Sequence, residues 1–360
     1  MRKCLTAGLM VMATMVVSPS FAQEDARATT CSNPVEIKGF TTCADVARAE
    51  AEGALVLYSP APEPGTVKIL EEFNKLFPNI KTSYVRLQTG ALYARLMAER
   101  QAGSYLADVL HMSDQTLVHD FQNKNGFAPY ASPQLSHYGA EYKSQPEGLW
   151  TWGAVIMAGF AYNPAFLKAE EAPKTWAEID NPRWDGAVSV KSSNSGLQFL
   201  TWELVGRANG GDAFWKKFSE LKPKAFDSYV QQYDRIVNGD DKLAVTAQYS
   251  GYLLYHKKGA PMEFVAPSDG LPAGPEIWGV TKEAPHPEAA RLFLDWFLSP
   301  LGQKVQAENI FLHSPRTDVD PPPGGAPIAE LKLMFLKESP ELLSRRKEFV
   351  RMWSTMSGLR

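Results

Sequence analysis

Small polar residues stand at four turns where an apolar stretch gives way to a helical one. Ser59, Thr89 and Ser113 occupy three of these turns, and the run Ser192-Ser193-Asn194-Ser195 occupies the fourth. Hydroxyl and backbone N–H groups in such turns lie at helix N-termini, which carry partial positive charge. Each turn taken alone is equally an ordinary helix cap. Together the four turns predict a cradle for an anion.

The first of these turns lies in a pattern typical of an open α/β sheet. Residues 54–58 (ALVLY) form a short apolar run, which predicts a buried strand. Residues 67–77 then repeat apolar side chains at helical spacing. Sheets of this kind bind ligands at the carboxyl ends of their strands, beside the N-termini of the helices that follow.

The same alternation continues along the chain. We expect strands over 80–87, 107–112, 187–191, 224–227, 243–247 and 262–266, and helices over 91–101, 197–208, 229–238, 252–258, 288–298 and 302–308. Two extended apolar segments, 149–162 and 277–281, interrupt this rhythm, and the second follows a Pro/Gly-rich loop expected over 268–276. The sequence therefore predicts two α/β lobes joined by two crossings, with a cleft that closes on a ligand.

These patterns divide the chain into five parts. We expect a signal peptide over 1–22, an N-terminal extension over 23–52, lobe one over 53–150 plus 279–360, lobe two over 160–275, and hinge segments over 150–160 and 272–280.

The first 22 residues have the composition of a secretory signal peptide. Arg2 and Lys3 precede the apolar stretch 5–17, and Ser20-Phe21-Ala22 is a small-x-small cleavage site. We expect cleavage after Ala22 and a mature monomer in the periplasm. The net charge of −3 gives no electrostatic reason to bind nucleic acid or an anionic membrane, so neither is an expected partner.

Two cysteines, Cys31 and Cys43, follow the signal peptide. An even pair in an exported protein predicts a disulfide, here within the N-terminal extension. A metal site is the weaker alternative, because no His lies nearby and two ligands do not complete a site.

Five segments in order resemble the bacterial extracellular solute-binding proteins of ABC importers, in the branch with ferric-ion, thiamine, phosphonate and sugar-phosphate receptors. They are GALVLYS (53–59), ALYARLMAERQAGSYLADVLHMSD (91–114), PKTWAEIDNPRWDGAVSVKSSNSG (173–196), IVNGDDKLAVTAQYSGY (236–252) and WGVTKEAPHPEAARLFLDWFLSPLGQKV (278–305). The similarity covers nearly everything after Glu50. It implies a two-lobed class II periplasmic receptor that has no catalytic activity or cofactor and delivers a small molecule to an ABC permease.

The family places its ligand contacts at the turns named above. Carried over by position, the binding residues are Ser59, Thr89, Gly90, Ser113 and Asp114 in lobe one, and Ser192, Asn194, Ser195, Tyr249 and Tyr252 in lobe two. Ferric-ion members use two adjacent tyrosines where this chain has Tyr249-Ser250, so one of the two phenolate ligands is missing. We therefore expect no metal, and if iron were bound, Tyr249 and Glu63 would be its ligands.

The resemblance and the turns favour a receptor for a small organic anion that carries a phosphonate, phosphate ester or carboxylate group. A ferric-ion receptor and a sensory partner of a membrane receptor remain as alternatives. A secreted enzyme is the weakest, because the chain contains no G-x-S-x-G, H-E-x-x-H or G-x-G-x-x-G motif. A Ser/His/Asp site assembled from distant positions stays open.

Overall fold

The computed structural model describes residues 29–337, 339 and 341–357. The expected signal peptide and its cleavage site after Ala22 lie outside the described residues. Within the described part of the chain, no helix combines the length and apolar character that crossing a membrane requires.

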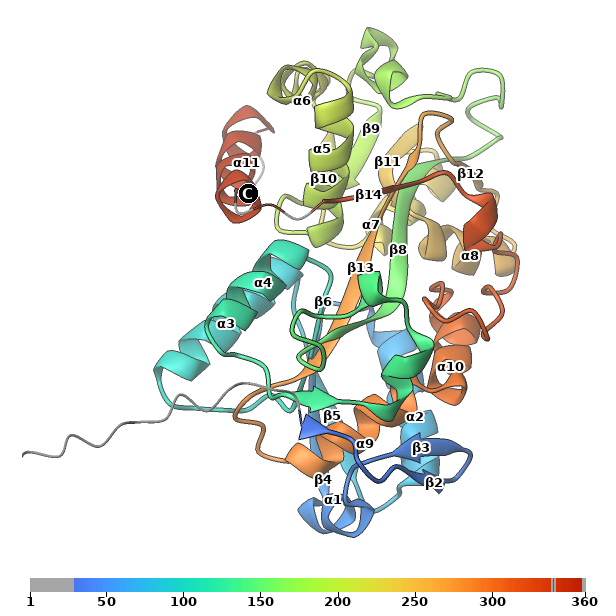
Figure 1. Cartoon of the computed structure of the whole chain (residues 1–360). Coiled ribbons are helices and arrows are strands. Elements are labelled where there is room, and N and C mark those ends of the chain that lie inside the picture. The colour runs from blue at the N-terminus through green and yellow to red at the C-terminus, as the bar shows by residue number, and fades with distance from the viewer. Residues whose placement is uncertain (1–28, 338, 340, 358–360) are drawn as a thin grey trace, which may run out of the picture.

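One mixed sheet runs through the molecule, and its main path has the strand order β10-β9-β11-β8-β13-β6-β4-β5 (Figure 1). The strands of this path are β4 (Ala54–Ser59), β5 (Lys81–Arg86), β6 (Val109–Met112), β8 (Thr151–Tyr162), β9 (Val188–Lys191), β10 (Lys224–Phe226), β11 (Leu243–Gln248) and β13 (Leu271–Val280). Off this path, β12 (Glu263–Val265) pairs with β8 and β14 (Leu333–Phe335) pairs with β13. The fold is the expected α/β architecture.

The long strands β8 and β13 pair antiparallel and belong to both halves of the sheet. At one end β13 pairs with β6, and at the other β8 pairs with β11. We call the half with β4, β5 and β6 lobe one and the half with β9, β10 and β11 lobe two. Within each lobe these strands are parallel, so their carboxyl ends share one edge.

The loop expected over 268–276 is wrong from Leu271 onward, where β13 begins. Pro272 and Pro275 argue locally against a strand, because proline donates no ladder hydrogen bond. Pairing with β8, far away in the sequence, overrides that local signal: Ala273 lies opposite Met157 and Pro275 opposite Val155.

Helices cover the sheet in both lobes (Figure 1). Lobe one carries α1 (Val46–Glu52), α2 (Glu63–Leu76), α3 (Thr89–Gln101), α4 (Gln115–Asn123), α9 (Pro287–Leu298) and α10 (Pro300–Ile310), and lobe two carries α5 (Gly196–Ala208), α6 (Asp212–Ser219), α7 (Tyr229–Asn238) and α8 (Tyr249–Lys257). Short 3-10 helices span Pro133–His137, Ala140–Tyr142, Trp176–Asp180, Pro182–Trp184 and Ile328–Glu330, and short strands are β1 (Thr29–Thr30), β2 (Val35–Ile37), β3 (Phe40–Thr42) and β7 (Tyr130–Ala131). Buried aromatic side chains fill both cores, such as Phe73 in lobe one and Trp184 in lobe two.

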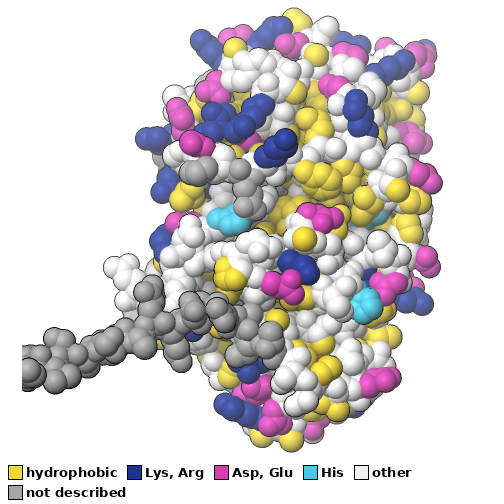
Figure 2. Space-filling view, in the orientation of Figure 1, with side chains coloured by type: hydrophobic (Ala, Val, Ile, Leu, Met, Phe, Trp, Pro, Cys, Tyr) yellow, Lys and Arg dark blue, Asp and Glu magenta, His cyan; other side chains and the backbone are white. Residues whose placement is uncertain are grey.

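The helix α11 (Leu342–Ser357) departs from the expected division, which assigned 279–360 to lobe one. Its Phe349 and Trp353 are fully buried in the lobe-two core, and the Phe349 ring lies 4.5 Å from that of Trp202. Arg346, on the same helix, is paired with Asp114 of lobe one. The helix therefore contacts both lobes, and Figure 2 shows Lys and Arg side chains gathered over it and the adjacent part of lobe two.

The expected disulfide joins Cys31 to Cys43, whose Cα atoms lie 5.7 Å apart. Next to it, the fully buried Asp295 of α9 accepts hydrogen bonds from Thr42 Oγ1 (2.6 Å), the Tyr130 hydroxyl (2.5 Å) and the Cys43 N–H (3.1 Å). Burial raises the pKa of the Asp295 carboxyl to about 6, although these hydrogen bonds act in the opposite direction. One side chain thus fastens the N-terminal extension to lobe one.

We predict that Asp295 makes the protein less stable as the pH rises. Its folded pKa of about 6 lies above the ordinary value of about 3.9, so the folded state holds a proton that the unfolded chain has already released. The stability present below about pH 4 is therefore lost as the pH rises through 6, by about 3 kcal/mol at most.

Urea unfolding at several pH values between 4 and 7 measures this effect, with Asp295→Asn as the matched variant. The free energy of unfolding of the wild type should fall relative to that of the variant across this range. If the free energies of unfolding of the two proteins differed by the same amount at every pH, the raised pKa of Asp295 would be contradicted.

Candidate functional site

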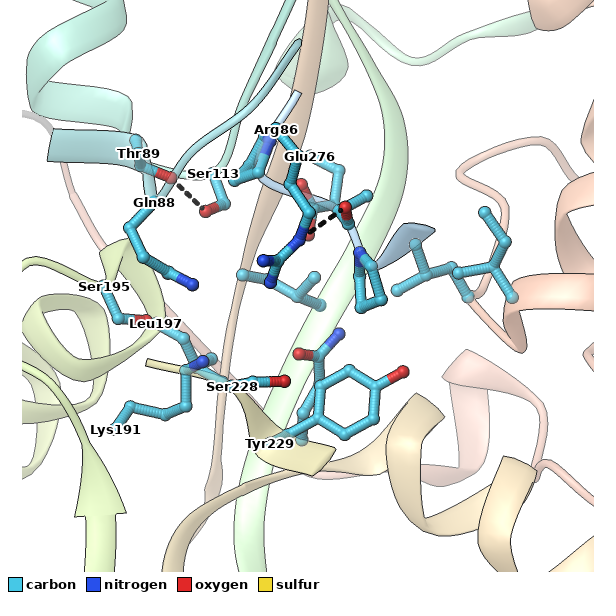
Figure 3. A pocket seen from close by; sticks show the side chains of 17 residues that line it. Arg86, Gln88, Thr89, Ser113, Lys191, Ser195, Leu197, Ser228, Tyr229 and Glu276 are labelled. Atoms are coloured by element: carbon cyan, nitrogen blue, oxygen red, sulfur yellow. Dashed lines mark hydrogen bonds between the residues drawn. The ribbon is translucent and has the colours of Figure 1, made fainter. Parts of the chain in front are cut away.

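A cavity lies between the lobes, at the edge of the sheet where the parallel strands end (Figure 3). Its lining comes from lobe one, lobe two and the crossing strands: Pro60, Ala61, Pro62, Arg86, Gln88, Thr89, Ser113, Ile156, Lys191, Ser195, Leu197, Ser228, Tyr229, Gln248, Glu276, Ile310 and Leu312. Its volume is about 50 Å³, which leaves room for a few water molecules. A ligand of several non-hydrogen atoms enters only when the lobes move apart.

The N-termini of five helices meet at this cavity. Their N-cap residues all line it: Pro62 before α2, Gln88 before α3, Ser195 before α5, Ser228 before α7 and Gln248 before α8. Except at Ser228, the N-cap side chain makes no capping hydrogen bond, so it does not satisfy the first N–H groups of its helix. The partial positive charges of these helix ends therefore add up in one place.

Two cations reinforce this positive potential from opposite sides of the cavity (Figure 3). Arg86 ends β5 in lobe one and donates from Nε to the Ala61 carbonyl oxygen at 3.2 Å, and Lys191 ends β9 in lobe two and donates from Nζ to the Asp227 carbonyl oxygen at 2.5 Å. Both hydrogen bonds go to backbone oxygens and therefore leave the two positive charges in place. Burial lowers the pKa of Lys191 to about 7, against the opposing effect of the Asp227 charge.

The lobes contact each other directly around the cavity. Gln88 donates from Nε2 to the Asp227 carbonyl oxygen, and the Gly90 N–H lies 3.4 Å from the Asn194 carbonyl oxygen. At Gly196, an added Cβ would lie only 2.7 Å from the Ser113 carbonyl oxygen of the other lobe. This geometry corresponds to a closed arrangement of the two lobes.

The structure brings part of the expected binding set together. Thr89, Ser113 and Ser195 line the cavity, and Thr89 Oγ1 lies 3.0 Å from Ser113 Oγ. Gly90 and Asn194 hydrogen-bond to each other beside it.

Ser59 lies one residue before the lining and is fully buried. Its Oγ accepts from the Ala61 N–H at 3.1 Å and lies 2.8 Å from Nδ1 of His111. The other ring nitrogen of His111 is hydrogen-bonded to Glu276. Hydrogen bonds thus connect Ser59 through His111 to Glu276, which lines the cavity, although the three residues lie on three strands that are distant in the sequence.

Two other expected residues, Asp114 and Ser192, are not among the cavity-lining residues and make their contacts elsewhere. Asp114 caps α4 by accepting from the Thr116 N–H at 3.0 Å, and it is paired with Arg346. The Ser192 N–H donates to the Phe226 carbonyl oxygen at 2.9 Å, whereas its buried Oγ has no hydrogen-bond partner among the described residues.

The two tyrosines and Glu63 are not among the cavity-lining residues. The Tyr249 hydroxyl accepts from the Ala326 N–H at 3.3 Å, and its ring stacks with that of Tyr252 at 6.1 Å. Glu63 is the first residue of α2. No group of three or more His, Cys, Asp or Glu side chains that could hold a metal ion occurs in the described part of the chain.

Several lining residues were not in the expected binding set. Ser228 could have been found, because it directly precedes the helix expected over 229–238 and such residues cap helices. Gln248 precedes α8, which begins at Tyr249, three residues before the helix expected over 252–258. Arg86 and Glu276 carry no local signal, since only the pairing of distant strands brings them to the cavity.

Comparison with known proteins agrees with this architecture. Residues 104–331 match the family model described as "Bacterial extracellular solute-binding protein". The chain is 26% identical over 277 residues to an uncharacterized protein of Haemophilus influenzae (71% of this chain, 76% of that protein). It is 22% identical over 276 residues to the Fe(3+)-binding periplasmic protein of Serratia marcescens (72% and 78%).

Two solved structures have the same fold. The periplasmic binding protein AfuA from Actinobacillus pleuropneumoniae, with exogenous fructose-6-phosphate bound, superposes with a TM-score of 0.76 at 22% identity over 86% of this chain and 99% of that one. Iron-bound HitA from Pseudomonas aeruginosa gives a TM-score of 0.72 at 21% identity, with 84% and 99% covered.

We predict that Gly196→Leu holds the lobes apart. The first atom of the new side chain would already overlap the Ser113 carbonyl group, whereas the helical backbone of α5 accepts leucine. With a saturating anionic ligand present, small-angle X-ray scattering should therefore give a larger radius of gyration for the variant than for the wild type.

Ser195→Ala is the control, because it removes an atom from the same helix start and Ser195 makes no capping hydrogen bond. Its radius of gyration should equal that of the wild type. If Gly196→Leu scattered like the wild type as well, the described closure of the lobes would be wrong.

Proposed function

Because the chain belongs to the bacterial extracellular solute-binding protein family, we propose that it captures a small organic anion in the interlobe cavity. The anionic group is a phosphonate, a phosphate ester or a carboxylate. The observation that carries this proposal is the meeting of five helix N-termini at one cavity.

The free energy expected from hydrogen bonds to the anion is sufficient for the affinity of a receptor. A hydrogen bond to a charged group contributes about 1.5–3 kcal/mol, so three or four of them supply micromolar affinity after the cost of association. An anion between Arg86 of lobe one and Lys191 of lobe two attracts both lobes, so it favours the closed arrangement. The fructose-6-phosphate in AfuA supports an anionic ligand for this fold.

The destination of the ligand follows from the family. We expect the mature protein to work as a monomer in the periplasm and to deliver its ligand to the transmembrane subunits of an ABC permease, without contact to nucleic acid. The periplasmic relatives support this location. A sensory role would use the same cavity and differ only in the membrane partner.

A catalytic role has less support than a binding role. Ser59, His111 and Glu276 are hydrogen-bonded in series like the serine, histidine and acid of a hydrolase triad, with Ser59 on Nδ1 and Glu276 on Nε2, the reverse of the nitrogens used in that triad. However, a nucleophile must reach its substrate, and Ser59 is fully buried and is not among the lining residues. We therefore expect one equivalent of ligand to be bound and none to be consumed.

A ferric-ion receptor is the second candidate, favoured by the similarity to the Fe(3+)-binding periplasmic protein of Serratia marcescens and to iron-bound HitA. The ligands expected for iron, Tyr249 and Glu63, do not line the cavity, and the Tyr249 hydroxyl already accepts from a backbone N–H. The positive surroundings of the cavity also disfavour a trivalent cation.

We predict that Lys191→Met weakens anion binding at least tenfold, because it removes one charge-assisted contact. Calorimetric titration with fructose 6-phosphate, 2-aminoethylphosphonate and succinate measures this loss. Lys242→Met, at an exposed position of the same lobe, is the control and should bind like the wild type.

The pH dependence provides a second readout. With a pKa of about 7, Lys191 is partly deprotonated in the free protein, and a bound anion favours its charged form. Binding at pH 8 should therefore take up a proton, and affinity should fall as the pH rises, relative to Lys191→Met.

A coloured complex with ferric citrate that is lost in Tyr249→Phe, with no heat from any anion, would overturn the proposal.

A further inference from the structure

Glu276 is the one acidic side chain among the described residues that line the cavity. It lies in β13, where the register with β8 shifts between Glu276 and Ile277, and such irregularities redirect side chains. Its exposed fraction is only 7%, so the carboxylate is largely withdrawn from bulk water and faces the same small space as Arg86 and Lys191 (Figure 3).

His111 holds this carboxylate in a defined orientation. Ser59 Oγ accepts from the Ala61 N–H and lies 2.8 Å from Nδ1 of His111. Because an ionised carboxylate accepts and does not donate, Nε2 of His111 carries the proton in its hydrogen bond to Oε2 of Glu276. The imidazole ring is itself fixed, because it stacks on Trp278 at 4.2 Å with an interplanar angle of 7°.

This arrangement leaves Glu276 as an acceptor toward the cavity. A carboxylate has about four acceptor positions, and the hydrogen bond from His111 engages one oxygen. A second negative charge close to it would be repelled, whereas a hydrogen-bond donor would be attracted. Among the described residues Glu276 forms its salt bridge with His111, whereas Arg86 and Lys191 donate to backbone oxygens, so compensation of the two cations does not account for this carboxylate.

We propose that Glu276 recognises a hydrogen-bond donor, an ammonium or a hydroxyl group, on the ligand whose anionic group the helix N-termini and the two cations hold. The ligand is then a bifunctional molecule with an acid group and a donor group. His111 and Ser59 are positioning residues that orient the Glu276 carboxylate. This inference rests on the proposed function, because it assigns the second half of the same ligand.

A matched set of phosphonates tests the donor directly. 2-Aminoethylphosphonate, 2-hydroxyethylphosphonate and propylphosphonate have nearly the same size and differ only in the terminal group. Calorimetric titration of the wild type should show that the amino or the hydroxyl compound binds roughly ten- to a hundredfold more tightly than the propyl compound. Whichever of the amino and hydroxyl compounds binds more tightly identifies the donor. A second set of three phosphonates, each longer by one methylene group, tests the distance between the acid group and the donor.

Glu276→Gln, which keeps the shape and removes the charge, should lose most of this preference while it still binds propylphosphonate. His111→Phe keeps a ring to stack on Trp278 and removes the donor to Glu276, so it should lose part of the preference. The ratio between two ligands is the readout, and a general loss of folded protein leaves that ratio unchanged. Glu263→Gln, an exposed acid in β12, is the control and should keep the full preference.

The outcomes separate the two proposals. If the wild type binds the three phosphonates equally, or if Glu276→Gln ranks them as the wild type does, the donor inference is overturned. The anion site is still supported in that case if Lys191→Met weakens the binding of all three phosphonates. If the wild type binds no phosphonate at either spacing, the inference fails for this acid group. If it also binds neither fructose 6-phosphate nor succinate, the proposed function fails with it.

Discussion

The antiparallel pairing of β8 and β13 is the constraint on which the site depends. These two strands belong to both lobes, so they fix how the two sets of parallel strands face each other. The strands of lobe one end at Ser59, Arg86 and Met112, and those of lobe two end at Lys191, Phe226 and Gln248, all beside the interlobe space. The helices that follow therefore begin there. A different register between β8 and β13 would separate the groups that now share one cavity.

Convergence of helix N-termini has an electrostatic cost as well as a use. Partial positive charges from several helices and the charges of Arg86 and Lys191 repel one another in a poorly hydrated space, and the lowered pKa of Lys191 reflects its burial there. An anion relieves this repulsion, and it does so best when both lobes contact it. Ligand binding and lobe closure are thus two consequences of the same charge distribution. Glu276, on one of the crossing strands, adds an acceptor to this donor-rich space and so limits which anions fit.

The sequence predicted the order of strands and helices well, because strand length and helical spacing are local properties. It also found Thr89, Ser113 and Ser195, since polar residues at strand-to-helix turns are recognisable without a structure. Glu276 escaped notice because its neighbouring prolines indicate a loop, and only pairing with β8 makes this segment a strand. The position of α11 was equally hidden: its aromatic residues show that one face is buried, but not which lobe covers that face.

The most direct test of the account is the identity of the molecule that the protein carries. Small-molecule mass spectrometry, applied to the denatured supernatant of natively purified full-length protein, would identify it, with metal analysis of the same sample. We expect about one equivalent of an organic molecule that has both an acid group and an ammonium or hydroxyl group. Stoichiometric iron without such a molecule, or a bound compound that lacks any acid group, would contradict the central claim that this cavity is an anion site.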